Sequence, residues 1–111
     1  MTTRGRSALK ALERSTGGPL TLGEFLAAIR KGEGWSLAEM GEKLGVSRTH
    51  LWEIEQGRRS LSPDRAAKFA RILGYHQEQM VELALQAILD QLKLKLKVHV
   101  QRAAAARPVP G

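Results

Sequence analysis

The sequence predicts an all-α domain of five short helices, followed by one short C-terminal strand. Three observations carry this prediction. Apolar residues recur at helical spacing from residue 21 to about residue 91, glycines separate most of these runs, and beyond them the spacing changes to strict alternation. Aromatic residues make up only 5% of the 111-residue chain, so we expect one small domain with a mostly aliphatic core.

The charge of the chain favours a polyanionic partner. Eighteen Lys and Arg residues exceed eleven Asp and Glu residues, which leaves a formal net charge of +7. Such a charge fits nucleic acid, and an anionic membrane surface is the weaker alternative. The chain has no cysteine, no signal peptide pattern, and no run near the roughly 20 apolar residues of a membrane span. We therefore expect a cytoplasmic, nucleoid-associated protein of a bacterium or its phage.

Residues 1–20 mix basic, small and hydroxyl side chains around a weak apolar cluster. Gly17-Gly18-Pro19 then breaks any helix that might have begun there. We expect a basic, disordered N-terminal arm. It either keeps the chain soluble or reaches into a minor groove.

Two capping boxes mark the starts of the first two helices. In each box a Thr or Ser is followed three residues later by Glu, and the pairs are Thr21 with Glu24 and Ser36 with Glu39. The first helix should run to about Lys31, and the second from about 36 to 44. Gly41 within the second helix lowers helix stability relative to Ala. Its presence indicates that another backbone passes too close for a larger side chain.

A tight turn at Gly45 precedes the third helix, predicted at 47–56. Gly45 can adopt the left-handed conformation that turns the chain, and Ser47 is the N-cap. Leu51 and Ile54 point inward at helical spacing. The outward side chains are an unusual set for a surface that meets only water: Arg48, Thr49, His50, Trp52 and Glu53.

A basic loop, Arg58-Arg59-Ser60, leads to a fourth helix that Pro63 opens and Gly74 ends. A fifth helix should run from about His76 to Gln91, without any Lys or Arg. Its apolar residues share one side, which we expect to face the core: Val81, Leu85, Ile88 and Leu92.

Leucine or valine alternates with lysine or histidine over residues 92–100, which is typical of a strand with one apolar and one cationic face. A lone strand is unstable, and no other segment has a strand pattern. The simplest partner is the same strand of a second copy, paired antiparallel across a two-fold axis. The alternative is that the fifth helix simply continues. Residues 101–111 should form a disordered tail.

Residues 21–73 resemble the Cro and lambda-repressor type of helix-turn-helix domain, often called the XRE family. The likeness is carried by Leu44-Gly45-Val46-Ser47, then Leu51, Ile54-Glu55-Gln56-Gly57 and the pair Arg58-Arg59. The resemblance implies a five-helix bundle with its helix-turn-helix domain at 21–74. The strand pattern makes residues 75–100, the fifth helix and the strand, the expected dimerisation region. The chain departs from the family pattern at Leu37, where relatives commonly have Gln, and at Trp52, a position that is usually polar.

In proteins of this type the helix after the turn lies in the major groove of DNA, which implies this role for residues 47–56. The expected base contacts come from its outward side chains, Arg48, Thr49, His50, Trp52 and Glu53. Arg48 suits guanine, Thr49 a thymine methyl, and Glu53 the amino group of cytosine. Trp52 either covers the sugar-phosphate backbone or packs against the C-terminal extension.

Four further residues suit the phosphate backbone, because helix starts and cationic loops attract phosphate: Ser36, Ser47, Arg58 and Arg59. The resemblance also implies a structural ion pair between Arg30 and Glu55. His50, His76 and His99 show no metal-ligand spacing, and no nucleophile motif or Gly-rich phosphate loop is present. We therefore expect neither catalysis nor a metal or other cofactor.

We predict a dimeric regulator of transcription that binds double-stranded DNA sequence-specifically and acts as a repressor. The alternative is a protein-interaction module, such as the antitoxin of a toxin-antitoxin pair, that docks through residues 76–100. The two functions predict different states of the purified protein: a dimer for the repressor, and an unpaired C-terminal strand for the docking module.

Overall fold

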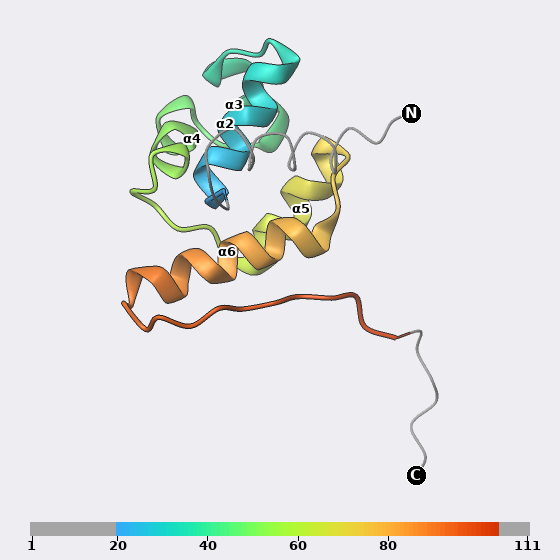
Figure 1. Ribbon diagram of the computed structural model, residues 1–111. Coiled ribbons are helices and arrows are strands. Elements are labelled where there is room, and N and C mark those ends of the chain that lie inside the picture. The colour runs from blue at the N-terminus through green and yellow to red at the C-terminus, as the bar shows by residue number, and fades with distance from the viewer. Residues whose placement is uncertain (1–19, 105–111) are drawn as a thin grey trace.

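The computed structural model describes residues 20–104, which form five helices and no strand. The helices are α2 (Leu22–Glu33), α3 (Leu37–Leu44), α4 (Arg48–Glu55), α5 (Pro63–Leu73) and α6 (Gln77–Gln91). Helices α2, α3 and α4 form one half of the bundle, and α5 and α6 form the other (Figure 1). Residues 92–104, here called the C-terminal segment, run back along α6. The rest of the expected N-terminal arm and residues 105–111 lie outside the described part.

The helix starts follow the capping signals. Thr21 Oγ1 accepts from the Glu24 backbone N–H at 3.1 Å, and Glu24 Oε1 accepts from the Thr21 N–H at 3.0 Å. The Ser36 and Glu39 box closes in the same way, at 3.0 and 2.7 Å. Both boxes are confirmed, because each involves groups only three residues apart and so depends little on the rest of the fold.

Two glycines lie where another stretch of backbone passes too close for a side chain. A Cβ at Gly41 would lie 2.7 Å from the carbonyl oxygen of Val46, which confirms that the backbone after the turn leaves no room for a side chain. Gly23 on α2 has the same role, which the sequence did not reveal. A Cβ there would collide with the carbonyl oxygens of Ile54 and Glu55 at the end of α4. These contacts press α4 against both α2 and α3.

The core is mostly aliphatic, as expected, with Phe25, Phe69 and Tyr75 as its aromatic members. The Phe25 and Tyr75 rings meet edge to face, with centroids 5.5 Å apart. Helix α6 enters this core through Met80 and Ala84, both fully buried. The expected inward face of this helix is therefore only partly right, because Val81 packs against the core but the fully buried residues are Met80 and Ala84. Its predicted members are only partly buried or exposed: Val81, Leu85, Ile88 and Leu92.

The expected C-terminal strand is also wrong. Residues 92–100 contain no strand, because side chains of α6 bond to the backbone groups that a neighbouring strand would otherwise pair with. Gln86 accepts from the Val98 N–H at 2.9 Å and donates to the Leu96 carbonyl at 2.8 Å. Glu82 accepts from the Val100 N–H at 2.9 Å. Alternate residues turn one backbone edge toward α6, so the period of two remains although residues 20–104 contain no second strand.

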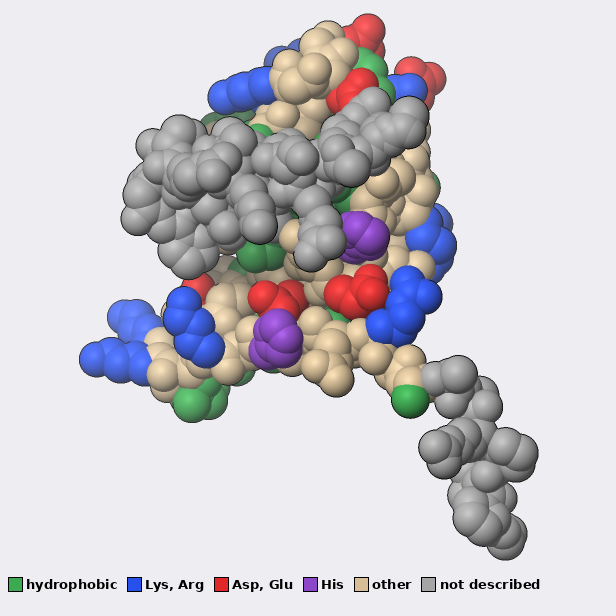
Figure 2. Space-filling view, turned by 45° about the vertical axis from the view of Figure 1, so that its right-hand side comes forward, with side chains coloured by type: hydrophobic (Ala, Val, Ile, Leu, Met, Phe, Trp, Pro, Cys, Tyr) green, Lys and Arg blue, Asp and Glu red, His purple; other side chains and the backbone are tan. Residues whose placement is uncertain are grey.

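Two further side-chain contacts hold the C-terminal segment to α6. His99 Nδ1 lies 3.3 Å from Glu82 Oε1, and Arg102 Nε lies 3.1 Å from Glu78 Oε2. Acidic, histidine and basic side chains accordingly sit next to one another where the C-terminal segment meets the bundle (Figure 2). The start of the predicted tail is thus held to α6 through Arg102.

Candidate nucleic-acid interface

Helices α3 and α4 are joined by a three-residue turn that fixes their relative orientation. Gly45 adopts the left-handed conformation, with φ 77°, and the Val46 N–H donates to the Gly41 carbonyl at 2.9 Å. Ser47 then caps α4 by accepting from the His50 N–H at 3.0 Å. Because the turn and the cap are both hydrogen-bonded, α4 is presented rigidly on the bundle.

One side of α4 is anchored and the other is open. Leu51 and Ile54 are fully buried beneath the helix. Arg48 and Thr49 are exposed in its first turn, and Trp52 keeps 39% of its surface accessible. The structure therefore brings most of the predicted base-contacting side chains together on one accessible surface of α4. His50 and Glu53 also belong to this set but are partly buried.

A second anchor lies at the end of α4, where Arg30 of α2 and Glu55 form a bidentate ion pair. Arg30 Nε donates to Glu55 Oε2 at 2.8 Å, and its second nitrogen donates to Oε1 at 3.0 Å. Only 3% of the Glu55 side chain is exposed. Its hydrogen bond to Glu55 raises the pKa of Arg30. Both side chains lie between α2 and α4 and away from the open surface of α4, which agrees with the structural role expected for this ion pair.

The basic pair after α4 divides between two partners. Arg59 donates from Nε, at 2.9 Å, to Oε1 of Glu53, and its second nitrogen lies 2.8 Å from the same oxygen. Arg58 instead lies over the Trp52 ring, 5.2 Å from its centroid. Sequence reasoning missed both contacts. They arise because Gly57 turns the chain back with φ 77°, which lets the Arg58 N–H donate to the Glu53 carbonyl.

Ser36 and Ser47, the two predicted phosphate contacts at helix starts, are exposed but already engaged as caps. Each hydroxyl oxygen accepts from a backbone N–H, so only its own hydrogen remains to donate to a phosphate. Leu37, which stands where relatives commonly have Gln, packs against the core. This position therefore serves the fold and offers no polar group to DNA.

His50 sits among positive charges. Burial lowers the pKa of His50, the cations Arg59 and Arg65 lower it further, and Glu53 opposes them. Arg65, in the first turn of α5, is a residue that sequence reasoning missed. Its signal was Pro63, which starts α5 directly after the basic loop, and the fold brings residue 65 close enough to His50 to lower its pKa. Arg65 extends the positive surface beyond α4.

A rigid pair of helices joined at Gly45, with the open side of the second helix lined by basic and polar groups, defines a helix-turn-helix DNA-binding domain. A model of the helix-turn-helix domain family matches residues 21–83, and the chain belongs to this family. The matched region includes α2 to α5 and extends into α6. Comparison with curated proteins and with solved structures found no match.

Residues 20–104 contain neither a cluster of metal ligands nor a helix that could span a membrane. No group of three or more His, Asp or Glu side chains there could hold a metal ion. No helix in the same range is long and apolar enough to cross a bilayer.

Proposed function

We propose that this protein is a regulator of transcription of the Cro and lambda-repressor type, which binds double-stranded DNA sequence-specifically and represses. The observation that carries the proposal is the asymmetry of α4. Leu51 and Ile54 fasten one side of this helix to the core, whereas Arg48 and Thr49 stand exposed on the other. A helix of this kind fits the major groove, where each base pair offers a distinct pattern of donors and acceptors.

Base reading begins at the first turn of α4. Arg48 places a planar guanidinium there and can donate two hydrogen bonds to a guanine. Thr49, beside it, offers a methyl group to thymine. Glu53 lies one turn further along and keeps Oε2 available, because Arg59 bonds to Oε1 alone. That free oxygen suits the amino group of cytosine.

Backbone contacts would come from the flanks of α4. Arg59 has further N–H groups beyond those that bond to Glu53 and can direct them to a phosphate. Arg58 and Trp52 form a flat cationic unit next to it, suited to the sugar-phosphate chain. These contacts position the protein without reading sequence.

A dimer would place two copies of α4 in successive major grooves. We propose that it forms through residues 76–100, where Leu92, Leu94 and Leu96 keep 62%, 48% and 55% of their surface exposed. Apolar groups exposed in this number favour a protein partner. A two-fold dimer would prefer a near-palindromic site, with half-sites about one helical turn apart.

The same exposed leucines support the second candidate function, an antitoxin-like module that docks a different protein through residues 76–100. Measuring the mass of the purified protein in solution distinguishes the two functions. A dimer favours the repressor, whereas a monomer that still selects a DNA site favours the docking module.

Selection of bound duplexes from a random DNA pool tests the proposal directly. The expected result is a near-palindromic consensus whose half-sites lie about one helical turn apart. A pool that remains random after repeated rounds would overturn sequence-specific regulation.

A further inference from the structure

Helix α6 ends differently from the other helices of the described chain. After α2, α3, α4 and α5 the residue in the left-handed conformation is a glycine, namely Gly34, Gly45, Gly57 and Gly74. After α6 it is Lys93, with φ 57°. Its N–H donates to the Asp90 carbonyl at 3.0 Å, and the Leu94 N–H donates to the Leu89 carbonyl at 3.2 Å. The hydrogen bonding is therefore that of a glycine-ended helix, but the residue is lysine.

A second lysine repeats the same conformation two residues later, since Lys95 has φ 55°. Side chains with a Cβ adopt this backbone region less readily than glycine, so two lysines here reduce stability. The negative end of the α6 dipole favours a positive charge at Lys93, but that effect fades within the last turn and does not account for Lys95. Strained positions of this kind cluster where a side chain is needed for binding.

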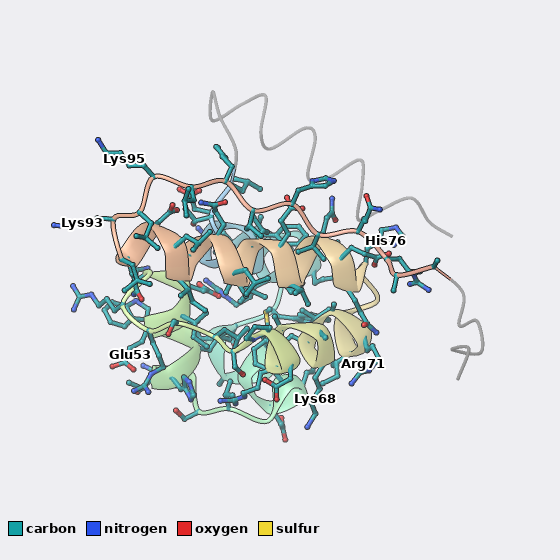
Figure 3. The ribbon with its side chains drawn as sticks, turned by 90° about the horizontal axis from the view of Figure 1, so that it is seen from below. Glu53, Lys68, Arg71, His76, Lys93 and Lys95 are labelled. Carbon is teal, nitrogen blue, oxygen red and sulfur yellow. The ribbon has the colours of Figure 1, made fainter. Side chains whose placement is uncertain are left out.

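Both lysines are free to meet an external anion. None of the ion pairs within residues 20–104 includes Lys93 or Lys95. Asp90, whose carbonyl accepts from the Lys93 N–H, already uses its carboxylate to accept from Gln86. Both lysine side chains are exposed and project away from the bundle (Figure 3).

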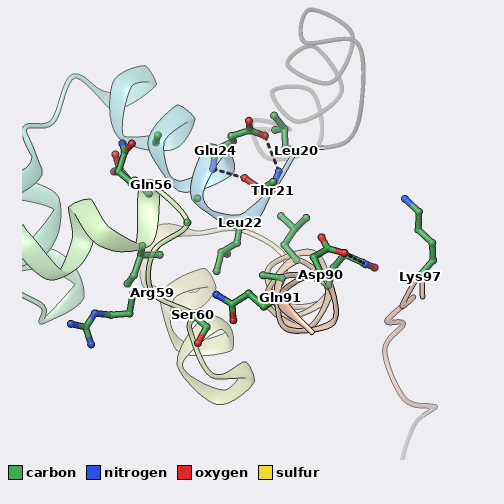
Figure 4. A pocket seen from close by; sticks show the side chains of 18 of the residues that line it. Leu20, Thr21, Leu22, Glu24, Gln56, Arg59, Ser60, Asp90, Gln91 and Lys97 are labelled. Carbon is green, nitrogen blue, oxygen red and sulfur yellow. Dashed lines mark hydrogen bonds between the residues drawn. The ribbon is translucent and has the colours of Figure 1, made fainter. Parts of the chain in front are cut away.

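The lysines lie at the end of the molecule that carries α4. Figure 3 shows Lys93, Lys95 and Glu53 at this same end, and Figure 1 places α4 and the end of α6 on one side. A groove of about 950 Å³ lies between them and includes Arg59 and Ser60 on one flank and Lys95 and Lys97 on the other. The end of α6 separates Ser60 from Lys97 in the close view (Figure 4). The lysines therefore form a second group of positive charge at the same end of the molecule as α4, across a groove that Glu24, Glu55 and Asp90 also line.

We propose that Lys93 and Lys95 form a second phosphate-binding element, here called the lysine turn. It contacts the DNA backbone beside the major groove in which α4 lies. The proposal rests on the proposed function of α4. The lysine turn adds affinity without reading sequence, because lysine meets phosphate as a point charge. Each contact releases about one counterion from DNA and so increases the salt dependence of binding.

The test measures DNA affinity across a salt series, by fluorescence anisotropy, with the duplex that the parent protein selects. Replacement of both lysines, Lys93→Gln with Lys95→Gln, should weaken binding several-fold at low salt. It should make the slope of log affinity against log salt shallower by about 1.8, since each phosphate contact contributes about 0.9. Lys93→Arg with Lys95→Arg keeps the charge and should retain the parent slope.

Two further variants separate binding from folding and from net charge. Lys93→Gly should raise the melting temperature, because glycine suits the left-handed position, and should still weaken DNA binding. Arg71→Gln removes one charge from the far part of α5 (Figure 3) and should change the slope less than Lys95→Gln does.

The outcomes distinguish the two proposals. If the parent binds its selected duplex and the double Gln variant keeps the same affinity and salt slope, the proposed role of the lysine turn is wrong, but the proposed function of α4 stands. If the parent shows no preference for any duplex, the function itself fails. Loss of binding to anionic lipid vesicles in the double Gln variant, with DNA binding unchanged, would also overturn the lysine turn.

Discussion

Glu53 and Arg59 bind each other on the open side of α4, with Glu53 Oε1 within 2.9 Å of Arg59 Nε and within 2.8 Å of its second nitrogen. Glu53 was expected to contact a base and Arg59 a phosphate. Their ion pair therefore couples the proposed base contact to the proposed phosphate contact. Glu53 restrains Arg59 and also reduces the local positive charge. The pair therefore sets a balance between specific and non-specific binding.

Replacement of Glu53 by Ala should raise affinity for non-specific DNA and reduce discrimination at one base position. The carboxylate repels phosphate and, when paired with cytosine, contributes about 1 to 3 kcal/mol of discrimination. Competition binding with selected and scrambled duplexes measures both effects. Glu42→Ala on α3 removes the same charge from outside the pair. Equal behaviour of the two variants would show that charge alone matters.

Replacement of Arg48 and replacement of Arg59 should impair DNA binding in different ways. Arg48→Ala should cost about 1 to 3 kcal/mol on the selected site and relax the preference at a single position. Arg59→Ala should weaken binding to every sequence alike and make the salt slope shallower by about 0.9. Gel-shift titration against single-base variants of the site separates the two patterns. Wild-type binding by both variants would exclude this surface as the interface.

Loss of the ion pair beneath α4 should destabilise the fold. Glu55→Ala leaves Arg30 without its carboxylate at a site where only 16% of the arginine side chain is exposed. Removing one partner from a buried pair costs about 3 kcal/mol or more. Urea unfolding measures this loss. Glu53→Ala, two residues earlier, breaks an exposed pair and should cost less than about 1 kcal/mol. A similar cost for both would contradict the structural role of Glu55.

Replacement by Ala should have opposite effects on folding stability at two glycines. Gly41→Ala should destabilise the protein by about 1 to 3 kcal/mol, because its Cβ would meet the Val46 carbonyl and force the turn apart. Gly32→Ala, in α2, meets no atom within 4 Å and should gain about 0.5 to 1 kcal/mol from helix propensity. Thermal unfolding of the two variants compares them directly. Stabilisation by Gly41→Ala would refute the close approach.

His50 should make folding stability depend on pH. Its pKa in the folded protein lies below the ordinary value of 6.5, since burial and then Arg59 and Arg65 disfavour its charged form. As pH falls below about 6.5, the unfolded chain therefore binds a proton before the folded chain does, and stability decreases until the folded pKa is passed. Urea unfolding between pH 5 and 7 should show a smaller dependence for His50→Gln. An unchanged dependence would exclude His50 as its source.

Sequence reasoning succeeded where the deciding contacts are short-range. The capping boxes at Thr21 and Ser36 join groups three residues apart, and Gly41 meets the backbone of Val46 only five residues on. It failed where the same pattern allowed two partners. Alternation over residues 92–100 indicated an extended chain, but the hydrogen bonds that hold it come from Gln86 and Glu82.

The amino-acid sequence by itself determined the helix boundaries, the turn at Gly45 and the outward side chains of α4, because these follow from local backbone preferences and helical periodicity. The tertiary structure alone decided which face of α6 is buried and which residue Glu53 bonds to. It also decided that the C-terminal segment lies along α6. These outcomes depend on which surfaces come within hydrogen-bonding or van der Waals distance, and that is settled only when the whole chain packs around Phe25 and Met80.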